Sequence, residues 1–185
     1  METNTAWIYV NNHDNSIRYV LGTKGKKTLF CFGINPSTAV PDKLDPTLKK
    51  VESIAKHNGY DSFIMFNVYP KRDTNFEDLE QSINDAEHIK NIEAITKTVS
   101  EYSELDIWAA FGNHIYDRDY LPLCFKDIYK KLSKQNIRWL TTGINKSGAP
   151  KHPLYQKKTS MLIDFDMATY IKTLWIDIEW GRIWI

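Results

Sequence analysis

The sequence is poor in cysteine and contains no long apolar run. Among its 185 residues there are two cysteines, Cys31 and Cys124, too few for a four-thiolate cluster or an all-cysteine zinc site. No stretch of about 18 apolar residues occurs, and residues 1–11 lack the basic and then apolar pattern of a secretion signal. These absences predict a reduced, cytoplasmic protein without a membrane span, a metal or a cofactor.

An excess of charge of either sign is also absent. The 24 Lys and Arg residues are balanced by 23 Asp and Glu residues, which gives a formal net charge of +1. This balance excludes a histone-like polycation, although a local basic face would still bind nucleic acid. The sequence has neither a GxxxxGKS/T phosphate loop nor an HExxH or Cys/His metal spacing, which argues against P-loop nucleotide hydrolysis and metal-dependent hydrolysis.

Apolar runs and helical periodicities alternate along the chain. Four short apolar runs predict strands buried on both faces, at 28–32, 63–66, 107–111 and 137–140. Helical spacing predicts helices between them, from Pro46 to a stop at Gly59, over 76–99 with a break near 84–85, and over 121–132. Asp45 is a suitable N-cap for the first of these helices. The alternation predicts an α/β fold with a mostly parallel, four-stranded sheet.

Two outer segments extend this predicted core. Apolar runs at 7–10 and 17–21, separated by Asn11-Asn12-His13-Asp14-Asn15, predict an N-terminal β-hairpin. In the C-terminal extension, 160–185, residues 163–175 have helical spacing and the Trp-rich stretch 180–185 is a candidate edge strand. We therefore expect one domain over 1–185, a monomer with its core at about 18–155 and the extension packed on that core.

Loops rich in Gly, Pro, Asn and His follow all four predicted strands. Ligands of open parallel sheets bind beyond the carboxyl ends of the strands, so these loops are expected to form the site. They are Gly33-Ile34-Asn35-Pro36-Ser37, Asn67-Val68-Tyr69-Pro70, Gly112-Asn113-His114 and 147–153.

The motifs in these loops resemble those of the uracil-DNA glycosylase superfamily. Gly33-Ile34-Asn35-Pro36 is similar to the Gly-Ile-Asn-Pro signature of its mismatch-specific uracil/thymine branch. Asn67 with the following Arg72-Asp73-Thr74 resembles the second motif of that branch, and His152-Pro153-Leu154 resembles the His-Pro-Ser motif of the superfamily. The resemblance implies a three-layer α/β/α fold and cleavage of a base from DNA.

A bacterial family of unknown function is more similar still. It is marked by Asn-Pro-Ser-Thr-Ala, Asp-Pro-Thr and His-Pro-Leu-Tyr, which occur here at 35–39, 45–47 and 152–155. This second resemblance covers the chain from about Arg18 to Tyr155.

The glycosylase resemblance implies catalytic roles for Asn35, His152 and Asp45. A pyrimidine leaves as an anion whose charge develops on O2, and a neutral His152 would donate a hydrogen bond to that oxygen. Asn35 stands where efficient uracil glycosylases have a water-activating Asp; its amide can position water but is not a useful base. Asp45 is the reserve carboxylate, and capping of the helix at Pro46 is its alternative role.

A substrate pocket is expected around these groups. Asn67 would pair with the Watson–Crick edge of a pyrimidine, Tyr69 would stack on it, and Asn113 with His114 would support the site or contact phosphate. Ser37 replaces a bulky Tyr that excludes 5-substituents in efficient uracil glycosylases, so it would leave room at C5. The full set of predicted substrate contacts is Gly33, Ile34, Pro36, Ser37, Asn67, Tyr69 and Asn113.

A DNA-binding rim is expected beside this pocket. An enzyme that flips a base out of a duplex must fill the gap, and Leu154 with Tyr155 stand where the superfamily has its wedge loop. Basic residues near the predicted site would neutralise phosphates, namely Lys71, Arg72, Lys151 and Lys157.

Together these expectations describe a monofunctional DNA glycosylase for uracil or a bulky 5-modified cytosine, such as those of phage DNA. Because no Lys occupies the nucleophile position, hydrolysis rather than a Schiff base is expected. DNA repair and defence against phage are both compatible settings. A non-catalytic DNA- or nucleotide-binding module and a hydrolase of free nucleosides or nucleotides remain alternatives.

Overall fold

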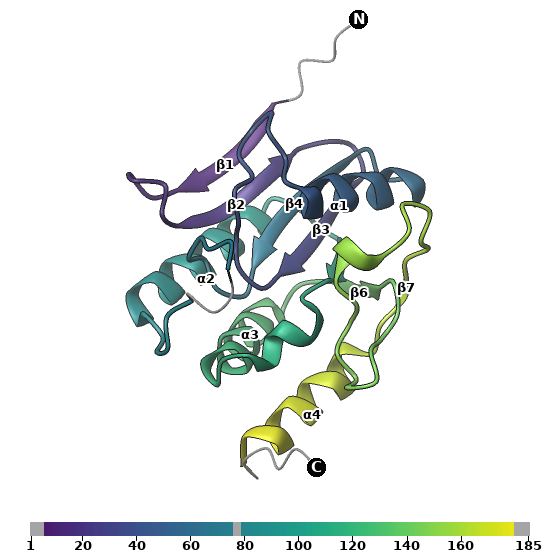
Figure 1. The fold of residues 1–185 in the computed structure, drawn as a ribbon. Coiled ribbons are helices and arrows are strands. Elements are labelled where there is room, and N and C mark those ends of the chain that lie inside the picture. The colour runs from purple at the N-terminus through teal and green to yellow at the C-terminus, as the bar shows by residue number, and fades with distance from the viewer. Residues whose placement is uncertain (1–5, 76–78, 180–185) are drawn as a thin grey trace, which may run out of the picture.

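The computed structural model describes residues 6–75 and 79–179, which form a mixed α/β architecture (Figure 1). Seven strands form one sheet in the order β1-β2-β4-β3-β5-β6-β7. The strands are β1 (Trp7–Asn11), β2 (Arg18–Thr23), β3 (Thr28–Gly33), β4 (Ser62–Asn67), β5 (Leu105–Ala109), β6 (Ile137–Thr141) and β7 (Ile163–Asp164).

The four strands predicted to be buried form the parallel centre of this sheet. β3 pairs in parallel with β4 and with β5, and β5 pairs in parallel with β6. The predicted size of four strands was too small, because β2 joins β4 and β7 joins β6, both antiparallel. Gly22 permits the first extension, since a Cβ at this position would lie 2.2 Å from the backbone oxygen of Phe63.

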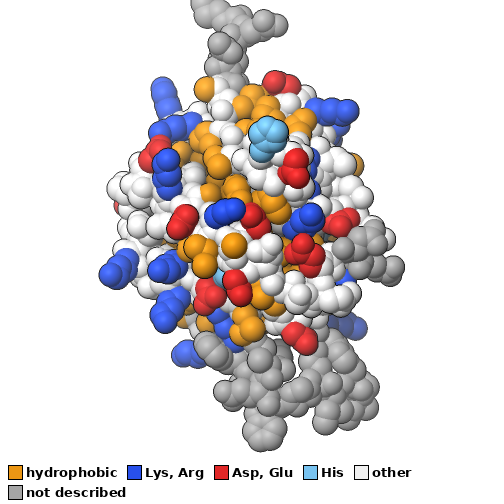
Figure 2. Space-filling view, turned by 90° about the vertical axis from the view of Figure 1, so that its left-hand side faces the viewer, with side chains coloured by type: hydrophobic (Ala, Val, Ile, Leu, Met, Phe, Trp, Pro, Cys, Tyr) orange, Lys and Arg blue, Asp and Glu red, His pale blue; other side chains and the backbone are white. Residues whose placement is uncertain are grey.

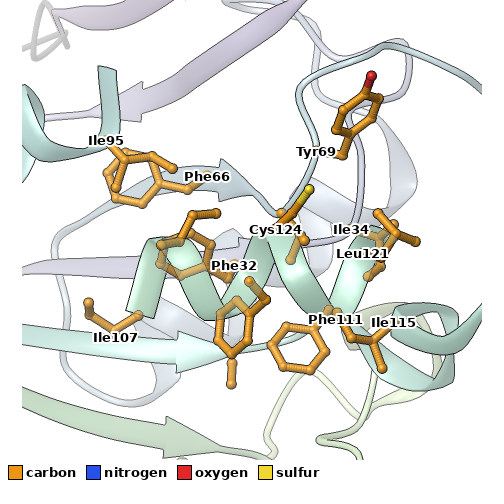
Figure 3. Packing of buried hydrophobic residues seen from close by; sticks show 14 of the residues in the cluster. Phe32, Ile34, Phe66, Tyr69, Ile95, Ile107, Phe111, Ile115, Leu121 and Cys124 are labelled. Atoms are coloured by element: carbon orange, nitrogen blue, oxygen red, sulfur yellow. The ribbon is translucent and has the colours of Figure 1, made fainter. Parts of the chain in front are cut away.

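Helices cover both faces of the sheet (Figure 1). Alternate residues of β3 point to opposite faces, so Leu29 and Cys31 pack beneath α1 while Phe30 and Phe32 pack beneath the other helices. Figure 3 shows Phe32 within the second of these clusters. A strand buried in this way needs apolar residues at every position, which explains the continuous apolar runs. The helices are α1 (Pro46–His57), α2 (Asp85–Val99), α3 (Tyr120–Leu132) and α4 (Met167–Glu179).

The helix boundaries follow the capping residues. Asp45 Oδ1 accepts a hydrogen bond of 2.9 Å from Leu48 N at the start of α1, and Gly59 follows its end with a φ of +80°. The predicted helix over 76–99 was too long: α2 begins at Asp85 because Asn84 caps it, residues 79–84 are not helical, and 76–78 lie outside the described residues.

The C-terminal extension contributes to the core through α4. Met167, Tyr170, Ile171 and Leu174 belong to the cluster that also contains residues of α2 and α3. Ile163–Asp164 is a short strand rather than part of a helix, and the predicted edge strand at 180–185 lies outside the described residues.

Basic and acidic side chains are intermixed on the face shown in Figure 2.

Cys31 and Cys124 are both free and buried. Within residues 6–75 and 79–179, no helix is long and apolar enough to cross a membrane.

Candidate functional site

A pocket of about 220 Å³ lies at the carboxyl ends of β3 and β4. All four predicted loops contribute to it, although they are far apart in the sequence. The residues predicted from sequence that line the pocket are Gly33, Ile34, Asn35, Ser37, Asp45, Asn67, His114 and His152. The other lining residues are Arg18, Thr47, Leu48, Met65, Asp73 and Thr74.

Gly33 opens the pocket at the end of β3. A Cβ at this position would lie 2.6 Å from Met65 Cε and 3.2 Å from Asn67 Oδ1. A larger residue would therefore displace the walls of the pocket, while Ile34 beside it anchors the loop in the hydrophobic core.

Asn35 is held in one orientation by the backbone. Its Nδ2 donates to the carbonyl oxygens of Asp73, at 3.1 Å, and Pro36, at 3.3 Å. The donors of the amide are therefore used by the protein, and Oδ1 is left as the acceptor that Asn35 can offer to water or a ligand.

Asn67 is buried with its amide unpaired. Its side chain is 1% exposed, and neither Nδ2 nor Oδ1 has a hydrogen-bond partner among the described residues. Leaving a buried polar group unpaired costs about 1–3 kcal/mol. The backbone of Asn67 is fixed, however, because Asn91 Nδ2 of α2 donates to its carbonyl oxygen at 2.9 Å. The Nδ2 donor and the Oδ1 acceptor of Asn67 are therefore both available to a ligand in the pocket.

His152 is held as a neutral imidazole. Burial lowers its pKa to about 4, with a further contribution from His114 that Asp45 partly opposes. Its Nδ1 accepts a hydrogen bond of 3.3 Å from the backbone N of Leu154, at the start of η3 (Pro153–Tyr155). Because Nδ1 is the acceptor, the single proton of the neutral ring belongs on Nε2, which is then a donor.

The third loop, which contains η2 (Gly112–Tyr116), packs against His152. Gly112 has a φ of +65°, and a Cβ there would lie 2.9 Å from the Cβ of His152. The ring of His114 lies edge-on to that of His152 at 6.3 Å, and its Nδ1 is 2.6 Å from Asp117 Oδ2. The turn therefore determines where the imidazole of His152 lies.

Asp45 combines the two roles considered for it. Its Oδ1 caps α1 through Leu48 N, as the sequence predicted, and its side chain also lines the pocket. The carboxylate therefore faces the pocket, while one of its two oxygens is hydrogen-bonded to the first turn of α1.

Ser37 connects this pocket to a second, more open one of about 420 Å³. The two pockets share Ser37, Asp73 and Thr74. The walls of the second pocket are mixed polar and apolar, and its remaining lining residues are Asn15, Thr38, Val40 and Arg72.

Three predicted substrate contacts lie elsewhere. Tyr69 is 1% exposed and packs in the core, where its hydroxyl donates to Glu80 Oε2 at 2.6 Å, so it does not face the pocket as a stacking platform (Figure 3). Pro36 is buried behind the lining. Asn113 is exposed, and its Oδ1 accepts hydrogen bonds from Asn145 and Ser147.

Arg72 is also not a free member of a phosphate-binding rim. Its Nη1 donates to Tyr9 Oη and Asn15 Oδ1, and its Nη2 donates to Ala39 O at 3.2 Å, which ties the hairpin to the first loop. Lys71 is half-buried and its backbone forms a bridge with Ile17.

The other predicted DNA contacts lie beside His152. Leu154 is 39% exposed and Tyr155 is 79% exposed, which leaves both apolar side chains open to solvent. Lys157 is exposed, and Lys151 is half-buried beside Gly143.

Arg18 is a charged residue of the pocket that was not predicted from sequence. It is a charged residue within the apolar run 17–21, and that position was the available signal. In the structure it is 1% exposed and lines the pocket. The part of the chain that the structure describes contains no group of three or more His, Cys, Asp or Glu side chains that could hold a metal ion.

Residues 18–154 match the family described as "Protein of unknown function (DUF1643)". The chain belongs to this family. The match includes every residue that lines the pocket and leaves out β1 and α4. No curated protein and no solved structure matches the sequence. Membership in DUF1643 therefore assigns no activity, and the chemistry of the pocket has to be argued from its residues.

Proposed function

We propose that the protein is a monofunctional DNA glycosylase for a deaminated or modified pyrimidine. It would flip the nucleotide out of DNA and hydrolyse the N-glycosidic bond, leaving an abasic site. The observation that carries this proposal is the meeting, in one pocket, of the unpaired amide of Asn67, the fixed Oδ1 of Asn35 and the neutral ring of His152.

The unpaired amide of Asn67 supports recognition of a planar base. One edge of a pyrimidine offers a donor and an acceptor side by side, which matches the Oδ1 and Nδ2 of an amide. Pairing would also recover the cost of burying Asn67 without partners. A volume of about 220 Å³ suits a small ligand, since pockets for drug-sized molecules range from roughly 300 to 1,000 Å³.

The state of His152 supports stabilisation of a leaving base. When the glycosidic bond breaks, negative charge develops on O2 of the pyrimidine. A donor such as Nε2–H of a neutral imidazole is worth roughly 3 kcal/mol at such a position. Its Nδ1 is already engaged with Leu154 N, so the ring is oriented before the substrate binds.

Asn35 would position the attacking water. Its Oδ1 is oriented by the two hydrogen bonds of Nδ2, so it can accept a hydrogen bond from water but cannot remove a proton at neutral pH. We therefore expect slow turnover compared with enzymes that have a carboxylate at this position. Asp45, which lines the same pocket, is the candidate for accepting the proton.

The space beside Ser37 supports a substituent on C5. The second pocket begins at Ser37 and has hydrogen-bonding side chains such as Asn15 and Asp73 in its walls, so a polar group larger than a methyl could extend into it. This feature favours a bulky 5-modified cytosine, such as those of phage DNA, over uracil alone. Defence against phage and repair of deaminated bases, both in the cytoplasm and by a monomer, are the settings that we propose.

Exposed groups around His152 support contact with DNA. Leu154 and Tyr155 are available to fill the gap left by a flipped base. Lys151 and Lys157 flank them and would contact phosphates, whereas Arg72 is removed from this set by its hydrogen bonds to the hairpin.

A non-catalytic nucleotide- or DNA-binding module is the second candidate. The observation that favours it is the commitment of Asp45 Oδ1 to the cap of α1, which leaves the pocket without a carboxylate devoted to catalysis. Such a module would bind the modified DNA and release no base.

The experiment that separates the two is a base-release assay on a panel of DNAs. Duplex and single-stranded oligonucleotides would carry uracil, a thymine mismatch, hydroxymethylcytosine or glucosylated hydroxymethylcytosine. We expect alkali-labile abasic sites on one of these substrates. Asn35→Ala and His152→Ala should each lower the rate by roughly 100-fold or more.

Matched controls test whether these losses are specific. Asn136→Ala and His13→Ala remove the same side chains from exposed positions outside the pocket and should retain full activity. DNA that is bound by the wild type but remains intact under all conditions would contradict the glycosylase proposal and favour the binding module.

A further inference from the structure

Arg18 is a buried cation in the wall of the pocket. Its side chain is 1% exposed. Arg18 is the first residue of β2, which lies between β1 and β4 in the sheet. Nη1 donates to Ala39 O at 3.1 Å, while Nε has no hydrogen-bond partner among the described residues. No ion pair joins Arg18 to a carboxylate within residues 6–75 and 79–179.

The surroundings of Arg18 leave its charge largely unneutralised. Arg72 donates to the same carbonyl oxygen, Ala39 O, so two guanidinium groups lie close together. Burial and, to a smaller extent, Arg72 lower the pKa of Arg18, while Asp45 and Tyr9 oppose the shift, and the resulting value is about 10. Because this pKa is still well above 7, Arg18 remains protonated at neutral pH.

A buried charge without a partner is costly, and proteins normally pair it. The charge of Asp45 acts on Arg18 across the same pocket, but no hydrogen bond or ion pair joins the two side chains among the described residues. A ligand that enters the pocket can therefore give the guanidinium of Arg18 the direct partner that it lacks. Asn67 and Arg18 line the same pocket and both have buried polar atoms without partners. The ligand should therefore offer a hydrogen-bonding edge to Asn67 and negative charge to Arg18.

We propose that Arg18 is a catalytic residue that stabilises the anionic base as it leaves. This inference rests on the proposed glycosylase function and deepens it. The substrate base is neutral and the departing base is an anion, so a fixed cation acts on the transition state more than on the bound substrate.

The step keeps all protons of Arg18 in place. The bond between C1′ and N1 breaks, and its electron pair stays with the base as negative charge on N1 and the carbonyl oxygens. Water adds its oxygen to C1′ and gives up a proton to Asp45, the carboxylate in the pocket wall, and the base anion later takes a proton from solvent. His152 contributes a dipole to this charge, whereas Arg18 contributes a full positive charge.

The test compares two bases that differ in the stability of their anions. Fluorine withdraws electrons, so 5-fluorouracil leaves more easily than uracil and depends less on a stabilising cation. In single-turnover base release, Arg18→Gln should slow uracil by roughly 100-fold and 5-fluorouracil by roughly 10-fold. Arg18→Lys keeps the charge and should reduce this difference between the bases.

Controls exclude effects of folding and of total charge. Arg138→Gln removes an exposed arginine that pairs with Asp164, outside the pocket, and should leave both rates unchanged. A thermal unfolding curve accompanies each variant, and Arg18→Met replaces Arg18→Gln if the latter does not fold.

A binding measurement with free 5-fluorouracil provides a readout that does not require catalysis. Between about pH 6 and pH 9 the base ionises while Arg18 stays charged, so its affinity for the wild type should rise with pH. Arg18→Gln should abolish this rise.

These two measurements separate the possible failures. Equal losses for the two bases, with an unchanged pH dependence of binding, would overturn the role of Arg18 and leave the glycosylase function intact. If neither base is released from DNA, the binding measurement alone decides: a rise in affinity that needs Arg18 supports the anion site, and its absence overturns it.

Discussion

At the residue scale, the pocket holds polar groups whose hydrogen-bonding capacity the protein does not use. Asn67 and Arg18 have buried atoms without partners in the described chain, while Asn35 is fixed so that only Oδ1 is available. Such groups reduce the stability of the free protein and become useful when a ligand pairs with them. Substitution of these residues should therefore affect the stability of the protein and its activity differently.

Asn67→Ala provides one test of this difference. The substitution removes a buried amide without partners, which stabilises the protein, and leaves a cavity, which destabilises it; the free energy of unfolding should therefore change by less than about 1 kcal/mol. Base release should fall by at least roughly 10-fold, because the edge of the base loses its partner. Urea unfolding and single-turnover kinetics measure the two effects.

Asn91→Ala is the matched comparison. Its Nδ2 donates to Asn67 O and Val68 O, so this substitution should lower the free energy of unfolding by about 1 kcal/mol or more. If Asn67→Ala instead destabilises the protein as Asn91→Ala does and leaves base release unchanged, the recognition role of Asn67 is wrong.

The pKa of His152 predicts a dependence of stability on pH. Its value of about 4 in the folded protein is below the 6.5 of the unfolded chain, so the unfolded state binds the proton first as the pH falls. The contribution of His152 is therefore fully present above pH 6.5 and declines down to about pH 4. Urea unfolding should show a shallower decline in this range for His152→Gln than for the wild type.

The same pKa predicts the dependence of activity on pH. Base release should be constant from about pH 7 to pH 5 and fall as the pH approaches 4, because protonation of Nδ1 breaks its bond to Leu154 N. The exposed His13→Gln should behave as the wild type in both measurements. An activity that falls with a midpoint near 6.5 would contradict the neutral, desolvated imidazole.

At the element scale, short turns after the strands bring distant side chains together. The turn at Gly112 packs under His152, and the loop after β3 provides both Asn35 and its acceptor Pro36. The contact of Gly112 with His152 joins the end of β5 to the start of η3. The position of His152 therefore depends on a turn that lies far from it in the sequence.

Gly112→Ala tests this dependence. The added Cβ would meet His152 Cβ at 2.9 Å and the residue would keep a φ of +65°, so both strain and a clash result. We expect a loss of about 1–3 kcal/mol in stability together with a strong fall in base release. Gly148→Ala, with a φ of +84° and no described atom within 4 Å of its Cβ, should lose stability but retain activity. Equal activity in the two variants would contradict the support of His152 by Gly112.

The central elements could be predicted from sequence because burial on both faces produces an unmistakable pattern. Strands β3 to β6 have this pattern, and the cap of α1 at Asp45 is a second local signal. The start of α2 at Asn84 was predicted only as a break within a longer helix. The two-residue strand β7 has too few residues for any periodicity, and the pairing of β2 with β4 depends on contacts far apart in the chain.

The site was predictable in part for the same reason. Asn35, Asn67 and His152 follow strands that end at one edge, which places them together. The direction of a side chain in a loop is not encoded locally, so Tyr69 was assigned to the pocket although it turns into the core. Arg18 lies at the start of a strand, where a search of the loops does not reach it.

At the scale of the whole molecule, the charge is nearly balanced, with a formal net charge of +1. Attraction to DNA must therefore come from a small number of basic residues near the site rather than from the overall field. Weak non-specific binding is expected, with a modest dependence on salt.

Lys157→Ala tests the local contribution. The logarithm of the DNA-binding constant against the logarithm of salt concentration should lose about one unit of slope relative to the wild type. Lys134 is also exposed, but it precedes β6 and so lies at the amino ends of the parallel strands, whereas the pocket lies at their carboxyl ends. Lys134→Ala should therefore leave the slope unchanged. Identical slopes for the two variants would place the DNA elsewhere on the surface.

The most direct test of the account is to detect the free base after incubation of the wild-type protein with DNA that carries one modified pyrimidine. Mass spectrometry would identify the base, and the abasic strand would be counted in the same sample. Equal amounts of both products are expected from at least one substrate, and His152→Ala should release both at a rate lower by roughly 100-fold or more. Intact DNA with every modified pyrimidine, despite binding, would contradict the claim that this pocket cleaves the glycosidic bond.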